Sequence, residues 1–262
     1  MNDYHPKFWQ GIWHRIQQEF RYLTCKEWSL SEVGRFWDSV SDYDDINEST
    51  YTYFRRFTNS WELAKDVVPF HCIMLDIQAR SGKGSEFWYQ RGRVKEGAVV
   101  DFSDFMLGLS RMRLKKYKNI FQFYKITDYN LPFDDCQFDL ICCYETIEHI
   151  GHRDLFFDEL HRVMKPGGIL ILTCPNILWE PVHWISAILN IHHSEGPHNF
   201  PRRKTLLKIF KSNKMKIIKE NTTIILPFNL PYMITINLFL EKVLPSFMLK
   251  IFGLRRTFIL RK

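Results

Sequence analysis

The sequence predicts an α/β fold in which helices cover both faces of a mostly parallel β-sheet. Two observations carry this prediction: apolar runs that end in an acidic residue recur along the middle of the chain, and segments with helical potential separate them. The first run, residues 72–75, ends in Asp76 and precedes a loop of small residues with Gly82 and Gly84. A buried strand, a tight loop and a helix start are typical of the first unit of a nucleotide-binding sheet.

The second and third strands are predicted from the next two apolar runs. Residues 98–100 lead to Asp101, and a carboxylate that leaves a second strand is suited to accept hydrogen bonds from two ribose hydroxyls. Residues 120–126 form the third run and lead to Thr127 and Asp128. We therefore expect three acidic residues at the same edge of the sheet.

Later segments complete the predicted sheet. Residues 138–143 form a fourth strand that leads into Tyr144 and the segment 145–149, and residues 169–173 form a fifth strand after a helix that stops at Pro-Gly-Gly. Residues 215–219 and 258–260 are the expected sixth and seventh strands.

The first 65 residues differ from this core, because aromatic and charged residues alternate there at roughly helical spacing. Ser29 followed by Glu32 has the pattern of a capping box that begins a helix. We expect a helical cap over residues 1–65, a core over 66–178, and a lid with the last strands over 179–262. The cap aromatics either pack on the sheet or form, over residues 43–53, a flap above a binding pocket.

Composition sets the remaining limits. The 262 residues suffice for one large α/β domain or two small ones, and 36 basic against 29 acidic residues give a net charge of +7. No arginine-rich tract accompanies this charge, which argues against nucleic-acid binding. The six cysteines form no Cys-x-x-Cys pair and Met1 begins no apolar signal segment, so a cytoplasmic protein in a reducing compartment is expected.

Four segments in order carry a resemblance to a known family: LDIQARSGKGS (75–85), VVDFSDFML (99–107), ITDYNLPFDDCQFDLICCYETIEHI (126–150) and LHRVMKPGGILILTCPN (160–176). Together they resemble the class I S-adenosylmethionine-dependent methyltransferases of the small-molecule type, similar to enzymes of quinone and lipid biosynthesis. The resemblance implies a Rossmann-like, seven-stranded, mostly parallel sheet with an antiparallel last strand. It also implies S-adenosylmethionine as the cofactor.

The resemblance assigns cofactor contacts to residues at the strand ends. The roles are Asp76 at the amino end of the cofactor, Asp101 on the ribose, Phe102 beside the adenine, Asp128 and the Thr127 backbone at the adenine amino group, and Tyr144 by the methionine portion.

The loop after the first strand departs from the family pattern, since Gln78 and Arg80 replace two glycines and only Gly82 remains in register. Glycines permit positive φ and close approach of a ligand. Either the loop binds the cofactor with altered geometry, with Arg80 bonded to the methionine carboxylate, or the chain is a partner subunit that has lost the site. A dehydrogenase needs the missing glycines to bind a pyrophosphate, and it fits less well.

The segment from Glu145 to His149 is a second candidate site. On one helical face, Glu145, Glu148 and His149 would hold a divalent cation, as the resemblance to Glu-x-x-Glu-His O-methyltransferases of quinone biosynthesis suggests. Alternatively Glu148 and His149 merely cap and pack the helix, or His149 is a pocket-lining or acid–base residue.

Residues 177–200 are expected to form the acceptor lid, with His198 as a candidate general base. A zinc site built from the local histidines, His183, His192, His193 and His198, is an alternative, although their spacing fits no standard ligand pattern.

Residues 222–252 are unusually apolar. They either pack on the core or form a surface that meets a membrane or a lipid-like acceptor, helped by the basic residues Lys242, Lys250, Arg255 and Arg256. The expected activity is methyl transfer to a small or lipid-linked acceptor, at oxygen first and at nitrogen or carbon after it.

Overall fold

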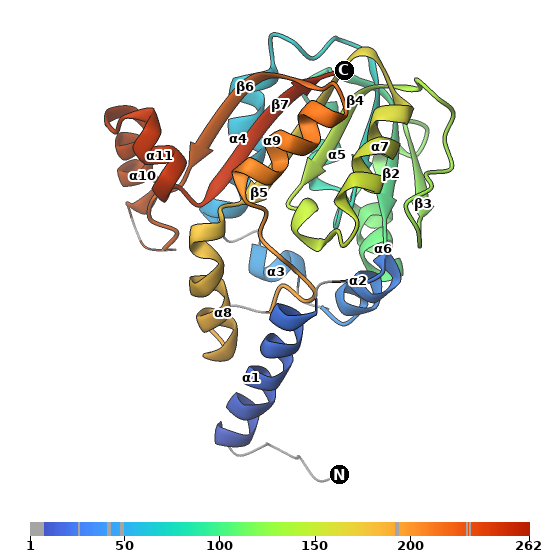
Figure 1. Ribbon diagram of the computed structural model, residues 1–262. Helices are drawn as coiled ribbons and strands as arrows, with labels where there is room; N and C mark the ends of the chain where they lie inside the picture. Colours follow the sequence, from blue (N-terminus) through green and yellow to red (C-terminus); the bar gives the residue numbers. More distant parts are fainter. Residues whose placement is uncertain are drawn as a thin grey trace.

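The computed structural model describes residues 8–25, 27–40, 43–47, 50–191, 194–228, 230 and 232–262, and its centre is a seven-stranded sheet of order β3-β2-β1-β4-β5-β7-β6 (Figure 1). The strands are β1 (Cys72–Ile77), β2 (Val94–Asp101), β3 (Phe121–Lys125), β4 (Phe138–Tyr144), β5 (Met164–Pro175), β6 (Lys216–Thr223) and β7 (Arg255–Arg261).

Strands β1 to β5 pair in parallel, whereas β7 runs antiparallel to both of its neighbours. This arrangement confirms the predicted fold class. In register, Asp76 of β1 lies opposite Val99 of β2 and Cys142 of β4. Because the carboxyl ends of parallel strands share one edge, the residues that follow β1, β2 and β4 meet there.

Helices pack on both faces of the sheet, which explains why its central strands are apolar on both sides. Figure 1 shows α7 and α9 on one face and α4 on the other. The helices are α1 (Phe8–Thr24), α2 (Leu30–Asp38), α3 (Tyr43–Asn47), α4 (Tyr51–Ala64), α5 (Lys83–Tyr89), α6 (Asp104–Arg113), α7 (Arg153–Val163), α8 (Glu180–Ile188), α9 (Arg203–Ser212), α10 (Met233–Val243) and α11 (Ser246–Phe252).

Helix α2 begins at the predicted capping box, because the Ser29 side chain accepts from the Glu32 backbone and Glu32 accepts from the Ser29 backbone at 2.8 Å. At its other end, Asp38 Oδ1 accepts hydrogen bonds from Ser103 Oγ at 2.6 Å and from the Phe105 backbone N–H at 3.1 Å. These bonds hold α2 over the loop that follows β2.

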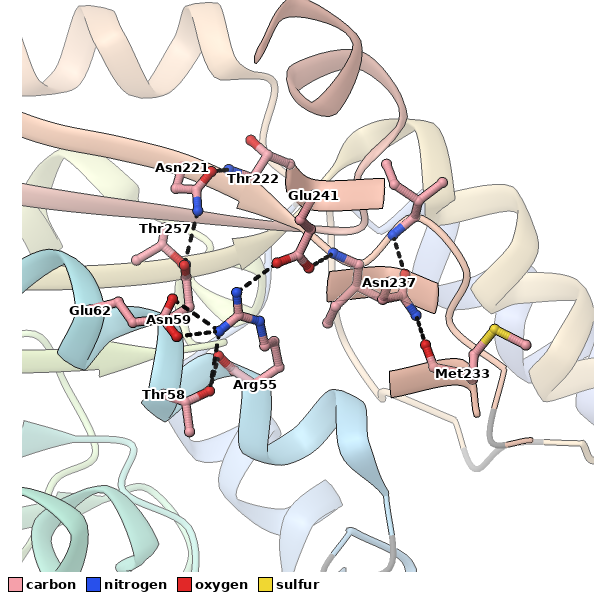
Figure 2. Close-up of polar contacts among 12 residues, drawn as sticks. Arg55, Thr58, Asn59, Glu62, Asn221, Thr222, Met233, Asn237, Glu241 and Thr257 are labelled. Atoms are coloured by element: carbon pink, nitrogen blue, oxygen red, sulfur yellow. Dashed lines mark hydrogen bonds and ion pairs between the residues drawn. The ribbon is translucent and has the colours of Figure 1, made fainter. Parts of the chain in front are cut away.

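Helix α10 is anchored by polar side chains (Figure 2). Asn237 Oδ1 accepts from the backbone N–H groups of Ile225 at 2.9 Å and Leu226 at 3.0 Å, and its Nδ2 donates to Leu226 O at 2.9 Å. One turn later, Glu241 Oε2 lies 2.6 Å from Nη2 of Arg55 in α4. The inner face of α10 is therefore its polar face.

The same close-up shows how α4 is joined to the edge of the sheet (Figure 2). Asn59 donates to Thr257 Oγ1 at 2.9 Å and accepts from Asn221 Nδ2 at 3.0 Å, while Arg55 Nη1 also contacts Glu62 at 3.0 Å. These bonds satisfy polar groups that burial would otherwise leave unpaired.

The outer face of α10 is apolar and exposed. Within the described residues, no helix combines the length and the apolar run needed to cross a membrane. The exposed apolar side chains of α10 are Ile234, Ile236, Leu238, Phe239 and Val243.

Candidate active site

The loop after β1 has the backbone of a glycine loop although two of its glycine positions carry side chains. Gln78 has φ 52°, Arg80 has φ 55° and Gly82 has φ 75°, all in the left-handed region. Holding Gln78 and Arg80 there costs about 1–3 kcal/mol each. The backbone thus adopts the left-handed conformation that glycine favours. The loop differs from the family pattern in the side chains at positions 78 and 80.

Both added side chains carry buried polar atoms that have no hydrogen-bond partner in the described part of the chain. These atoms are Oε1 and Nε2 of Gln78 and Nη1 of Arg80. The Arg80 guanidinium lies over the Trp37 ring, 3.5 Å from its centroid, and its Nη2 donates to Glu145 O at 3.4 Å. Buried polar atoms without partners in the protein are unusual and are typical of a ligand-binding site.

Asp76 and Asp101 are buried at the same edge. Asp76 Oδ2 accepts from Ser85 Oγ at 2.7 Å, and burial raises the pKa of Asp76 to about 7. Asp101 accepts from the backbone N–H of Arg80 at 2.8 Å and of Ser103 at 3.0 Å. Burial raises the pKa of Asp101 to about 6, although the charge of Arg80 opposes this change. Asp101 therefore braces the loop that carries Arg80.

The predicted adenine contacts lie in different surroundings. Phe102 is buried against α2, where a Cβ added to Gly34 would stand 2.2 Å from the Phe102 carbonyl oxygen. Thr127 and Asp128 are exposed after β3, and Asp128 Oδ1 accepts from the Asn130 backbone N–H at 2.8 Å. The structure thus separates Thr127 and Asp128 from the buried part of the predicted site.

A narrow crevice beside the loop gathers the remaining predicted cofactor residues. Its walls include Asp76, Gln78, Arg80 and Tyr144, and its volume is about 10 Å³. Such a space holds about one water molecule. Side chains of the N-terminal helices close it, namely Tyr43, Tyr53, Arg56 and Phe57.

A much larger cavity of about 790 Å³ adjoins this crevice. Tyr43, Tyr53, Arg56 and Arg80 line both spaces. The rest of the cavity wall is largely apolar, with contributions from Trp179, Val182, Ile191, Phe228, Leu230 and Leu254.

Glu145 and Glu148 both line the large cavity, but their surroundings shift their pKa values in opposite directions. Glu145 forms an ion pair with Arg255, with 3.1 Å between Oε1 and Nε. Burial favours a raised pKa for Glu145, yet Arg255 and Arg56 outweigh it and hold that pKa below its ordinary value. Burial, reinforced by the charge of Glu145, holds the pKa of Glu148 well above its ordinary value, and Glu148 Oε2 has no partner among the described residues.

The expected metal site at Glu145, Glu148 and His149 does not form. Glu145 has φ 49°, and a 3₁₀ turn, Ile147–His149, replaces the helix that would have placed the three side chains on one face. Across the described residues, no group of three or more His, Cys, Asp or Glu side chains is arranged to hold a metal ion.

The candidate catalytic histidines lie outside the cavity wall. His149 Nδ1 is 3.0 Å from Pro197 O, and burial, with the charge of Arg80, lowers the pKa of His149 to about 3. His198 Nδ1 is 2.8 Å from Gly196 O. The histidine in the cavity wall is His183, whose Nδ1 lies 3.9 Å from Glu195. His192 and His193 lie outside the described residues.

Sequence reasoning missed two cavity residues and misplaced two others. Arg56 and Trp37 belong to no motif, because their roles depend on how the cap folds over the sheet. Arg255 and Arg256, which one of the two alternatives placed at a membrane surface, are each only 6 % exposed, and Arg255 is bound to Glu145. That expectation for the two arginines was wrong.

Comparisons with known proteins agree with this geometry. A family model described as a methyltransferase domain matches residues 75–172. The ubiquinone/menaquinone biosynthesis C-methyltransferase UbiE of Chromobacterium violaceum is 29% identical over 166 residues, which are 62% of this chain and 68% of that protein. The enzyme of the same name from Paraburkholderia phymatum is 27% identical over 63% of this chain and 70% of its own length.

Solved structures share the fold. The [4+2]-cyclase SpnF has a TM-score of 0.64 at 13% identity, over 88% of this chain and 95% of its own. Geranyl diphosphate C-methyltransferase from Streptomyces coelicolor A3(2), solved with Mg²⁺, geranyl diphosphate and S-adenosyl-L-homocysteine, has a TM-score of 0.61 at 15% identity, over 88% and 97%. At these identities the likeness concerns the fold alone.

The fold, the matched domain and the sequence relatives make this chain a class I S-adenosylmethionine-dependent methyltransferase, with S-adenosylmethionine as its cofactor. Within that class it is similar to the C-methyltransferases of quinone biosynthesis. The names of these relatives specify methylation of carbon, which does not support the expected transfer to oxygen.

Proposed function

We propose that this methyltransferase transfers the methyl group to a carbon atom of a lipid-like small molecule bound in the 790 Å³ cavity. One observation carries the proposal: the cavity shares Arg80, a residue of the loop after β1, with the crevice that gathers the cofactor candidates. The apolar wall suits a hydrophobic acceptor. The names of the relatives, which are quinone-biosynthesis C-methyltransferases, support carbon as the atom methylated.

In the crevice, Arg80 is proposed to bind the cofactor carboxylate and Gln78 its polar groups, because their unpaired buried atoms lie in the walls. Asp76 would pair with the cofactor amino group, and Asp101 would hold the loop and reach the ribose. Phe102, Thr127, Asp128 and Tyr144 are proposed to make the cofactor contacts that the family resemblance implies, with Thr127 and Asp128 at the exposed end of the site. Bound S-adenosylmethionine supplies an activated methyl group on a sulfonium.

The cavity would act mainly by positioning the acceptor carbon and excluding water. Glu148 is proposed to accept the proton that leaves the acceptor, since Oε2 is unpaired in the cavity wall and its raised pKa makes it a stronger base than a free carboxylate. Helix α8, which supplies Val182 and His183 to the wall, would serve as the acceptor lid.

The cofactor assignment is tested by calorimetric titration with S-adenosylhomocysteine and with 5′-methylthioadenosine, which lacks the carboxylate. We expect Arg80→Met to weaken the first ligand by at least ~10-fold, as for a lost charged hydrogen bond, and to leave the second unchanged. Arg91→Met, a surface guanidinium over Phe87, is the control. Equal affinity of Arg80→Met and the parent for S-adenosylhomocysteine would contradict the role of Arg80.

The acceptor class is tested with methyl-labelled S-adenosylmethionine and a prenylated hydroquinone. We expect the label on a ring carbon, located by nuclear magnetic resonance, and we expect Glu148→Gln to lower kcat more than it raises KM. Label on oxygen, or transfer to a water-soluble hydroquinone at the same rate, would refute the proposal for a lipid-like carbon acceptor.

We also propose that the enzyme rests on a bilayer surface through α1, α8, α10 and α11. All but three of the exposed large apolar side chains in the described residues lie in α1 or in residues 178–191 and 228–252. Trp179 Nε1 donates to Phe252 O at 2.8 Å and Arg15 Nε donates to Ile188 O at 2.7 Å, so these elements adjoin one another. Patches of this kind mark protein or membrane contacts.

A bilayer suits this surface because the acceptor cavity reaches it. Val182, Ile191, Phe228 and Leu230 line the cavity and are also exposed on the patch. Lys242 on α10 adds a positive charge that favours anionic lipid. An acceptor dissolved in the bilayer would then enter the cavity without crossing water.

Flotation with vesicles of phosphatidylcholine and phosphatidylglycerol tests this contact. We expect the parent to float with the vesicles and Phe239→Ser/Phe247→Ser to lose most of the bound fraction. Phe70→Ser is the matched control, because Phe70 is 66% exposed but lies away from the patch. Equal losses in the control, or a parent that self-associates without floating, would contradict a bilayer partner.

A further inference from the structure

Arg56 is a buried arginine whose outer nitrogens have no partner among the described residues. It lies on α4, is 9% exposed, and its Nε donates to Tyr53 O at 3.1 Å. The guanidinium carbon stands 4.5 Å from the centroid of the Tyr53 ring. The two terminal nitrogens make no hydrogen bond and no ion pair with any described residue. Buried arginines are rarely left so, because an unpaired charge is costly to desolvate.

The position of Arg56 is as informative as its lack of partners. It lines both the narrow crevice and the large cavity, so it stands at the junction where the cofactor and the acceptor would meet. Tyr43 and Tyr53 line both spaces as well, and their ring centroids are 6.3 Å apart. The Tyr53 ring packs against the guanidinium, and Arg56 lines both spaces.

The other charges of the cavity are accounted for by one another. Arg255 pairs with Glu145, and His183 lies 3.9 Å from Glu195. Burial and the neighbouring charge of Glu145 hold the pKa of Glu148 well above its ordinary value, and no bond joins Glu148 to Arg56 among the described residues. Arg80 is assigned above to the cofactor carboxylate. Glu145 and Glu195 act on Arg56 through space but do not bond to it.

We propose that Arg56 is a binding site for an anionic oxygen group on the methyl acceptor, namely a phosphate, a carboxylate or an ionised hydroxyl. The proposal rests on the cavity being the acceptor site. A guanidinium presents paired N–H donors that match two oxygens or one shared oxygen, and such charge-assisted bonds are the stronger ones in proteins. The apolar wall would bind the chain of the acceptor, and Arg56 would select and orient its head.

An ionised hydroxyl next to the methylated carbon would gain a further advantage. A nearby cation favours the charged form of the hydroxyl, so its pKa would fall on binding. The electron-rich ring carbon beside that oxygen would then attack the methyl group, and the sulfur would leave with the bonding pair. The ring carbon would afterwards lose its proton to the proposed acceptor Glu148.

The test compares ligands that share a chain and differ in their head group. Decyl phosphate, decanoate, 4-decylphenol and decanol are titrated by calorimetry into protein saturated with S-adenosylhomocysteine, below their aggregation concentrations. In the parent, we expect at least one of the first three to bind ~10-fold or more tighter than decanol, the gain of a charged hydrogen bond. A preference for decylphenol that grows with pH identifies an ionised hydroxyl, and a preference for the other two identifies phosphate or carboxylate.

Variants then assign the effect to Arg56. Arg56→Met is expected to bind the preferred anion no better than decanol. Arg56→Lys keeps the charge but not the paired donors, so its affinity for the anion should lie between those of Arg56→Met and the parent. Arg93→Met is the matched control, because Arg93 is 8% exposed and bonds to Val68 O and Lys65 O away from the cavity. It should leave all four affinities unchanged.

Three results would overturn the proposal. The first is equal binding of anionic and neutral chains by the parent, and the second is full anion affinity in Arg56→Met. The third is a loss of S-adenosylhomocysteine affinity in Arg56→Met with 5′-methylthioadenosine unaffected, which would place the cofactor carboxylate on Arg56. Failure of the parent to bind S-adenosylhomocysteine would instead contradict the proposed function, on which the role of Arg56 rests.

Discussion

The guanidinium carbon of Arg80 lies 3.5 Å from the centroid of the Trp37 ring. This contact joins the loop after β1 to helix α2 of the N-terminal cap. Tyr43 lies near the same guanidinium, with 5.9 Å from its ring centroid to the guanidinium carbon. Because the crevice beside these rings measures only about 10 Å³, we expect cofactor binding in it to require a movement of the cap or of its side chains.

We expect Trp37→Ala to raise the association rate of S-adenosylhomocysteine by about 5- to 30-fold, because a desolvated cation–π contact worth ~1–2 kcal/mol is removed. Stopped-flow measurement gives the rate. Trp13→Ala, at a 62% exposed position on α1, should leave it unchanged. An unaltered rate in Trp37→Ala would show that the contact does not limit entry.

The buried carboxyls predict how stability depends on pH. The pKa of Asp76 is raised from 3.8 to about 7 and that of Asp101 to about 6. Both groups are protonated in both states below pH ~3, so stability is highest there with respect to them. As pH rises above about 4, the unfolded chain loses these protons while the folded protein still holds them, until the pH passes about 6 for Asp101 and about 7 for Asp76. The free energy of unfolding then falls by about 1.4 kcal/mol for each pH unit between the unfolded and the folded pKa of a group.

The variant Asp76→Asn should therefore show a smaller drop in melting temperature than the parent between pH 5 and pH 8. The measurement is made without cofactor by calorimetry. Asp134→Asn, an exposed surface position, should follow the parent. A drop in Asp76→Asn as large as in the parent would mean that Asp76 ionises freely in the folded protein.

Glycine at position 78 should stabilise the cofactor-free protein. Gln78→Gly relieves a left-handed backbone and removes two buried unpaired polar atoms, which outweighs the added flexibility of the unfolded chain. We expect a gain of about 1 kcal/mol from the urea midpoint. Gln122→Gly, in the exposed part of β3, should lose a similar amount. A destabilised Gln78→Gly would refute the strain argument.

The ion pair between Arg55 and Glu241 should be essential for the position of α10. Its side chains are only 6% and 9% exposed, so Arg55→Met leaves a buried charge and should cost about 3–5 kcal/mol in urea unfolding. Arg55→Met/Glu241→Gln should recover most of the loss, since the amide oxygen still accepts from Ile224. Glu62→Gln, at a 57% exposed side chain, should cost less than about 1 kcal/mol, and an equal cost there would contradict the assignment.

The strands were predictable because each is a short run of apolar residues whose local pattern survives in the fold. Residues 72–75 and 138–143 lie within β1 and β4, and Ser29 caps α2 as its spacing with Glu32 predicts. The buried carboxylates were found from the same pattern, since a strand end fixes where the next residue lies.

Features that depend on distant partners were not predictable. Glu145 lies in a segment with helical potential, but its pairing with Arg255 of the last strand accompanies a left-handed backbone and a 3₁₀ turn. The sequence of helix α10 is typical of an apolar helix that buries its apolar face. Only the fold shows that Asn237 faces inward, because the backbone at residues 225–226 needs its amide.

Because Asn237 and Glu241 fasten α10 from the inside, its outer side chains contribute little to keeping the chain folded. The two faces of this helix can therefore change independently. The inner residues determine whether the helix stays in place, and the outer residues determine what the surface of the protein contacts. In the proposed bilayer contact, replacing Ile234, Leu238 and Phe239 by polar residues would weaken the contact with lipid and leave the fold intact.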